Sequence, residues 1–204
     1  MSVSAIQIDP YLDPPLVRHR IDVETYHRMG EAGLIAPGQR TELIEGEVID
    51  MAPIGSAHSG RVNTLNALLT AAIGGRAIVA VQNPVILGLH CEPQPDLSVL
   101  RPREDFYSDA HPTAAETLLV VEVSDSTIAF DRGVKLPLYA RHGVPEYWLV
   151  DLVAGRLEAY HTPVDGLYRH TDLYRDERIS LQTLPEVCIE LAPLRLVGES
   201  RTDP

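Results

Sequence analysis

The segment TLLVVEVSDSTIAFDRGVKLPLYARHGVPEYWLVD, residues 117–151, decides the fold class. It opens with an aliphatic, β-branched run, which is typical of a strand buried on both faces of a sheet. Residues 131–144 then predict a helix of about three turns, with Asp131 as its N-cap and Pro137 bending or shortening its first half. Residues 146–151 predict a further strand. The segment therefore indicates an α/β protein.

The sequence on either side of this segment supplies the other elements of the expected fold. Residues 22–34 predict a short helix, 40–53 a β-hairpin that turns at Glu45 and Gly46, and 57–75 a core helix with an apolar stripe. Together with the opening segment they predict a central mixed sheet flanked by helices, with additional β-hairpins. The remaining strands are expected at 77–87, at 95–100, in a long hairpin at 155–175 that turns at Asp165 and Gly166, and at 179–194.

Length and composition bound the organisation of the chain. At 204 residues one well-buried domain is expected, at 21–195, between an irregular arm at 1–20 and a polar tail at 196–204. No apolar run is long enough to span a membrane and no signal peptide is recognisable, so a cytoplasmic protein is the default expectation. Cys91 and Cys188 form no metal-binding pair, and reduced thiols without an assigned role are expected.

The formal net charge of -12 speaks against nucleic-acid binding, because such proteins usually neutralise phosphates with a surplus of Lys and Arg. The net charge is a sum over the whole chain. It leaves room for a local group of arginines beside a cleft, or for a cluster of carboxylates that binds a divalent cation.

Lys135 is the only lysine among 17 basic residues, and three carboxylates interrupt apolar strands elsewhere. These are Glu45, Asp96 and Glu122. A carboxylate inside a buried strand is costly unless a cation pairs with it. If Asp96 lies on the strand beside Glu122, the two like charges need a divalent metal or a shared proton. Lys135 follows Glu122 by 13 residues and could reach the same point from the next helix.

Four separated motifs, in the order ELIEGEVIDMAPIGSAH, QPDLSVL, EVSDST and VKLPLYA, resemble the Uma-two branch of the PD-(D/E)XK nuclease superfamily over roughly residues 20–195. In that branch the lysine has moved from the strand motif to the next helix. Ser124 occupies the usual lysine position here and Lys135 stands in the helix. The sequence departs from the family at EVSDST, where the family often has EVLSPST, a loop longer by one residue.

This resemblance implies a restriction-endonuclease-like fold and a metal-dependent endonuclease that cleaves DNA, acts as a homodimer and needs no organic cofactor. Asp96, Glu122 and the carbonyl of Val123 would bind Mg²⁺, for which Mn²⁺ could substitute. Glu45 would be a catalytic residue, either as an auxiliary ligand or as a water-mediated acid, and Lys135 would be the electrostatic partner of the attacking hydroxide. We expect Lys135→Ala to stop cleavage and to spare the fold. The residues expected to contact substrate are His58, Arg61, Arg132 and Arg141.

Each of these assignments has a structural alternative. Asp96 could cap a turn, Glu122 could form a buried ion pair with Lys135 without any metal, and Glu45 could simply serve its hairpin turn. Two other functions stay open: a nuclease-fold protein retained for binding or assembly without catalysis, and a small-molecule enzyme with the same carboxylate cleft. Arginines converging beside the carboxylates would favour DNA, and their absence would weaken that reading.

Overall fold

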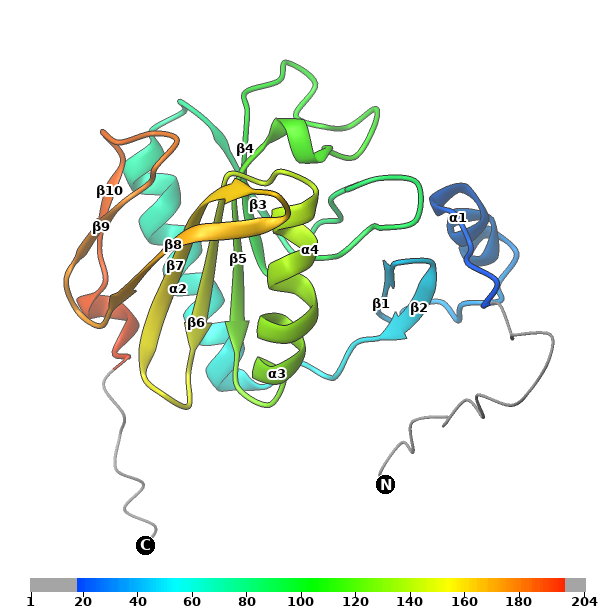
Figure 1. Cartoon of the computed structure of the whole chain (residues 1–204), viewed down its shortest axis with the longest axis horizontal. Coiled ribbons are helices and arrows are strands. Elements are labelled where there is room, and N and C mark those ends of the chain that lie inside the picture. Colours follow the sequence, from blue (N-terminus) through cyan, green and yellow to red (C-terminus); the bar gives the residue numbers. More distant parts are fainter. Residues whose placement is uncertain (1–17, 197–204) are drawn as a thin grey trace, which may run out of the picture.

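The computed structural model describes residues 18–196, so most of the expected arm at 1–20 and all but the first residue of the expected tail at 196–204 lie outside the described residues. A six-stranded mixed sheet forms the centre, in the order β3-β4-β5-β6-β7-β8 (Figure 1). Only the β5–β6 pair is parallel among these strands. The six strands are β3 (Ile78–Val81), β4 (Leu97–Leu100), β5 (Thr117–Ser124), β6 (Glu146–Asp151), β7 (Arg156–Val164) and β8 (Leu167–Tyr174).

Helices cover both faces of this sheet. The long helix α2 (Ser56–Ile73) lies on one face, and the successive turns α3 (Ile128–Phe130), η2 (Asp131–Lys135) and α4 (Leu136–Arg141) lie on the other (Figure 1). A small hairpin of β9 (Arg178–Ser180) and β10 (Cys188–Glu190) flanks α2, followed by the short turn η3 (Ala192–Leu194). The mixed sheet, its helical layers and its hairpins confirm the expected architecture. No helix within 18–196 is long and apolar enough to cross a membrane.

Strand β5 is buried along its whole length and alternates between the two layers. Val121 and Val123 pack in the core beneath α2, whereas Val120 packs with the tyrosines and leucines beneath α4. Alternation predicts that Leu118 lies on the same side as Val120, but it packs in the α2 core. The β4–β5 register shifts between Val99 and Leu100, and such a β-bulge lets consecutive residues lie on one face.

The N-terminal third adds a helix and a hairpin beside the sheet (Figure 1). Helix α1 (Val23–Glu31) begins where the Asp22 carboxylate accepts the Thr25 amide at 2.7 Å, as its sequence predicts. The strands β1 (Thr41–Ile44) and β2 (Glu47–Asp50) pair around Glu45 and Gly46, which have φ of 50° and 81°. Both central residues are left-handed, the pattern of a type I′ hairpin turn.

The helix after β5 starts earlier than predicted. It begins at Ile128 with Thr127 at the N-cap, so the expected N-cap role of Asp131 is wrong. The Asp131 carboxylate instead accepts the hydroxyls of Ser124 at 2.5 Å and Thr127 at 2.7 Å. The turn from Asp131 to Lys135 is π-helical, directly before Pro137. Proline lacks an N–H and its ring collides with the preceding helical turn, and a wider turn relieves that conflict.

Two strand predictions were too long. The residues expected to extend at 77–87 form a strand only from Ile78 to Val81, because a loop with Pro84 follows. The stretch 179–194 contributes two short strands rather than one. The 3₁₀ turn η1 (Ala114–Glu116) ends the loop between β4 and β5. The long hairpin turns at Asp165 and Gly166 as expected.

Glu146, at the start of β6, makes the stability of the fold depend on pH. Burial raises the pKa of its carboxyl to about 7, against hydrogen bonds from Gln182 N at 2.8 Å and Trp148 Nε1 at 2.7 Å. The unfolded chain releases this proton near pH 4.5 and the folded chain only near pH 7. Stability therefore falls by about 3 kcal/mol at most between these values.

Glu146→Gln should remove this contribution to the pH dependence. The glutamine side chain has one acceptor oxygen, so one of the two N–H donors loses its acceptor, at a pH-independent cost of about 1–3 kcal/mol. The wild type should therefore have the larger free energy of unfolding at pH 5. This difference in the free energy of unfolding should shrink or change sign by pH 8. Urea unfolding of both proteins at pH 5, 6, 7 and 8 measures the difference, and a gap that stays constant across this range would refute the assignment.

Candidate active site

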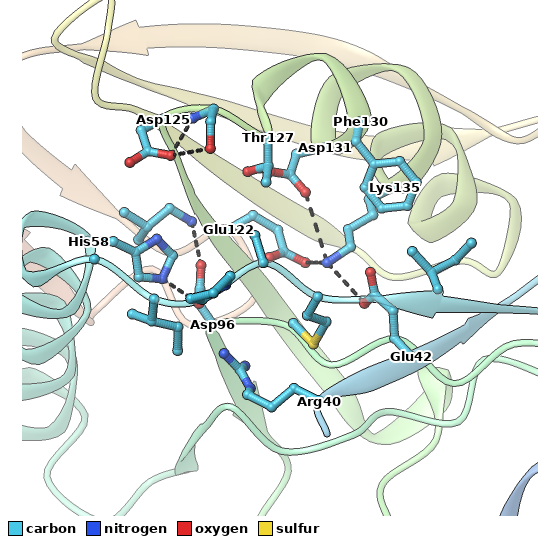
Figure 2. Close-up of a pocket in the computed structure, with 18 of the residues that line it drawn as sticks. Arg40, Glu42, His58, Asp96, Glu122, Asp125, Thr127, Phe130, Asp131 and Lys135 are labelled. Atoms are coloured by element: carbon cyan, nitrogen blue, oxygen red, sulfur yellow. Dashed lines mark hydrogen bonds and ion pairs between the residues drawn. The ribbon is translucent and has the colours of Figure 1, made fainter. Parts of the chain in front are cut away.

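A cavity of about 380 Å³ opens beside the ends of β4 and β5, between the β1–β2 hairpin, the start of α2 and the turns α3 and η2. Its polar side chains come from segments far apart in the sequence and point toward one another (Figure 2). Six carboxylate residues line it, against two permanently charged cations, Arg40 and Lys135. The six are Glu42, Asp50, Asp96, Glu122, Asp125 and Asp131.

Lys135 lies at the inner wall of this cavity. Its side chain is 4% exposed, and its Nζ is 3.1 Å from Glu122 Oε1, 3.1 Å from Glu42 Oε2 and 3.9 Å from Asp131 Oδ1 (Figure 2). Burial alone would lower the pKa of this ammonium. The surrounding carboxylates outweigh burial and raise the pKa above its ordinary value, so Lys135 stays charged.

Glu122 stands on β5 and reaches the same point. Its Oε1 accepts hydrogen bonds from Lys135 Nζ and from Tyr139 Oη, both at 3.1 Å. Within the described residues Oε2 takes part in no hydrogen bond, and Glu122 lines the cavity. Burial, reinforced by the nearby carboxylates, raises the pKa of Glu122 well above its usual range in spite of Lys135. An additional cation at this carboxylate would favour its ionised form.

Asp96 directly precedes β4 and is held by three donors. Its Oδ2 accepts the Val123 amide at 2.9 Å, and its Oδ1 lies 2.8 Å from His58 Nε2 and 3.4 Å from Gln82 Nε2. The hydrogen bond to Asp96 raises the pKa of His58, which stands near the start of α2. The bond to Val123 places the carboxylate beside the peptide that follows Glu122. The condition set by the sequence is met, because β4 pairs with β5 and both carboxylates line one cavity.

Glu42, rather than Glu45, is the upstream glutamate of this group. Glu45 stands on the hairpin turn, 45% exposed, and binds Arg141 Nη2 at 2.6 Å outside the cavity. Glu42 is 3% exposed and contacts Lys135. The sequence carried the signal that identifies it. Glu42 lies inside a strand as Glu122 does, whereas Glu45 belongs to the turn and must face outward.

The arginines expected at the site lie elsewhere. Within the described residues Arg61 on α2 bonds only to the carbonyl of Arg195, and Arg132 bonds Asp151 and Glu158. With Arg141 held by Glu45, none of the three lines the cavity. Arg40, which precedes β1, lines it instead. Sequence reasoning missed this residue because it lies outside any recognisable pattern. Of the expected contacts, the structure brings only His58 to the carboxylates.

The donors at Asp96 and Glu122 fit a hard divalent cation. Their carboxylate oxygens, with Val123 beside them, are the ligand type that Mg²⁺ and Mn²⁺ take. No three His, Cys, Asp or Glu side chains within 18–196 are arranged as a metal cage. An ion at Asp96 and Glu122 would therefore complete its coordination with backbone oxygen and water, as Mg²⁺ commonly does.

A pair of matched variants separates Glu42 from Glu45. If the cavity acts on a phosphodiester, Glu42→Gln should lower the cleavage rate by about tenfold or more, because it removes one of the three carboxylate charges that surround Lys135. Glu45→Gln should leave the rate within about twofold, since it weakens only an exposed ion pair. Initial cleavage rates at saturating Mg²⁺ measure the effect of both variants. Equal losses of rate in the two would contradict the assignment of Glu42, in place of Glu45, as the upstream glutamate.

Comparison with known proteins agrees with this architecture. Residues 23–192 match the family described as "Uma2: Putative restriction endonuclease". A solved structure described as "a putative nuclease belonging to DUF820", from Anabaena variabilis ATCC 29413, has a TM-score of 0.58 at 17% identity, over 76% of this chain and 89% of that chain. At that identity the likeness shows the fold alone. No curated protein matches the chain. The restriction-endonuclease-like fold is thus confirmed, and the chain belongs to the Uma2 family.

Proposed function

We propose that this protein is an Mg²⁺-dependent endodeoxyribonuclease, with Mn²⁺ as a possible substitute for Mg²⁺. The observation that carries the proposal is the cavity itself, where buried Lys135 contacts Glu122 and Glu42 beside the carboxylate of Asp96. Membership of a family described as restriction endonucleases supports DNA as the substrate. The chemistry would be the hydrolysis of a phosphodiester bond by water.

The side chains have distinct roles in this reaction. Asp96 and Glu122 would hold the cation, which when bound acidifies a water and offsets charge on the phosphate. Lys135 holds its ammonium at the inner wall, where it stabilises a hydroxide and the negative charge that develops on phosphate oxygens. Glu42 fixes the ammonium from the other side at 3.1 Å. His58 keeps Asp96 oriented through its 2.8 Å hydrogen bond.

We extend the proposal to a cytoplasmic homodimer. Cleavage of both strands of a duplex requires two such sites, and a dimer supplies them. The cysteines Cys91 and Cys188 are free thiols, as in proteins of a reducing compartment. Cys91 is buried, and its Sγ accepts the Glu45 amide at 3.3 Å, which gives it a structural role in the hairpin.

A binding or assembly role without catalysis is the second candidate, and one observation favours it. Arg61, Arg132 and Arg141 lie outside a cavity in which, among the described residues, six carboxylate residues face two permanent cations, Arg40 and Lys135. Such a surface repels phosphate unless cations bind to it. The two functions therefore differ in how DNA affinity responds to a divalent metal.

Divalent metal should tighten DNA binding by about tenfold or more if the cavity binds the phosphate backbone. The measurement is fluorescence anisotropy of a labelled oligonucleotide with the full chain, in EDTA and in Ca²⁺, which commonly binds such sites without supporting hydrolysis. Ionic strength is matched with NaCl. A DNA affinity that is the same in EDTA and in Ca²⁺ would contradict the proposal, and no DNA binding in either condition would favour the assembly role.

A further inference from the structure

A second cavity adjoins the candidate active site. It has a volume of about 530 Å³ and lies between α1, residues 35–41 and the loops that carry Pro84, Gln94 and His111. Arg40 lines both cavities, and within the described residues no other residue does so. The two cavities therefore both border on the side chain of Arg40.

The charge of Arg40 is not neutralised by an ion pair with any described residue. Its Nη2 donates to Gln94 Oε1 at 3.3 Å, and no carboxylate within residues 18–196 lies within ion-pair distance of it. Nine other arginines do pair with a carboxylate. The other arginines within 18–196 that have no such partner line neither cavity. In Figure 2 the guanidinium of Arg40 lies on the Asp96 side of the active-site cavity. The N–H donors of this guanidinium have no anionic partner within the described residues, and they lie beside the active-site cavity. Their geometry suits a phosphate group.

The second cavity differs in chemistry from the first. Among the residues that the structure describes, one carboxylate residue, Glu31, lines it. Its wall carries two imidazole rings, those of His27 and His111, set edge to face with centroids 6.3 Å apart. His27 is anchored by buried Glu92 at 2.7 Å, whereas the exposed ring of His111 has no hydrogen-bond partner within 18–196. Aromatic rings of this kind stack on the face of a nucleobase, and amide groups form hydrogen bonds with its edge.

We propose that Arg40 binds the phosphate next to the scissile one and that the second cavity holds the nucleoside attached to it, as an unpaired nucleotide of the substrate. This inference rests on the proposed nuclease function. In a duplex the faces of a base are covered by its neighbours, so an imidazole can stack on it only after it leaves the helix. The protein should therefore prefer DNA that is single-stranded or unpaired beside the cut.

The test is the affinity of the full chain for a dye-labelled 12-nucleotide single strand and for its duplex, in Ca²⁺. The wild type should bind the single strand about tenfold more tightly than the duplex. Arg40→Gln should lose about tenfold or more of the single-strand affinity. Arg61→Gln is the matched control, because it removes the same charge from a residue outside both cavities, and it should change the affinity by about twofold or less.

His111→Ala provides a second variant that leaves the fold intact, since the ring is exposed and unbonded within the described residues. It should weaken single-strand binding by about fivefold or more and leave duplex binding unchanged. Equal losses in Arg40→Gln and Arg61→Gln, or no loss in His111→Ala, would overturn the inference. If the wild type cleaves DNA while these variants bind normally, only this inference fails. If the wild type neither binds nor cleaves DNA with Mg²⁺ or Mn²⁺, the proposed function fails with it.

Discussion

Replacing Lys135 with methionine should reduce DNA cleavage by about 10²- to 10³-fold, the usual cost of removing one donor that stabilises developing charge. The same change should lower the free energy of unfolding by about 3–5 kcal/mol. The physical reason is the 4% exposure of this side chain among three carboxylates. Without the ammonium, Glu42, Glu122 and Asp131 lose their shared cation inside the protein.

The expectation that Lys135→Ala spares the fold is therefore revised by the burial of the residue. A second variant separates stability from catalysis. Adding Glu42→Gln to Lys135→Met removes one of the unpaired charges, and should recover part of the lost stability without restoring cleavage. Urea unfolding and initial cleavage rates measure the two effects. A Lys135→Met protein that cleaves at the wild-type rate would exclude the lysine from the chemistry.

The double variant Asp96→Ala, Glu122→Ala should lose both divalent-metal binding and cleavage. These two residues supply the side-chain oxygens assigned to the cation, and backbone and water ligands alone do not hold Mg²⁺ at millimolar concentrations. Titration calorimetry with Mn²⁺ should give a measurable heat for the wild type and none for the variant. The matched control is Glu45→Ala, Glu47→Ala, which removes two exposed carboxylates outside the cavity. Heat retained by the double variant would place the metal elsewhere.

Local patterns in the sequence were sufficient for most of the fold. The aliphatic run of β5, the apolar stripe of α2 and the turn at Glu45 and Gly46 each express a preference that the rest of the structure does not oppose. The start of the helix after β5 could not be predicted in this way. Asp131 has the chemistry of an N-cap, but the hydroxyls of Ser124 and Thr127 draw its carboxylate into the interior.

The residues of the site could be predicted where a buried charge requires a partner of opposite charge. Asp96 and Glu122 stood out because a charge in an apolar strand requires compensation, and Lys135 stood out as the only lysine of the chain. The structure brings all three into one cavity. The choice between Glu42 and Glu45 required the position of each residue in the hairpin, because Glu42 lies inside a strand and Glu45 stands at the turn. The positions of the arginines could not be predicted either, because they depend on ion pairs between distant segments. Arg132 and Arg141 carry positive charge near the site in sequence, yet Glu158 and Glu45 bind them elsewhere.

Nicking of supercoiled plasmid and of single-stranded DNA by the purified protein, in Mg²⁺ or Mn²⁺, tests the central claim most directly. The Asp96→Ala, Glu122→Ala variant, prepared in parallel, controls for contaminating nucleases. We predict metal-dependent cleavage by the wild type, abolished by EDTA and absent from the variant. Cleavage that persists in the variant, or no cleavage of either DNA by a wild type that binds Mn²⁺, would contradict the account.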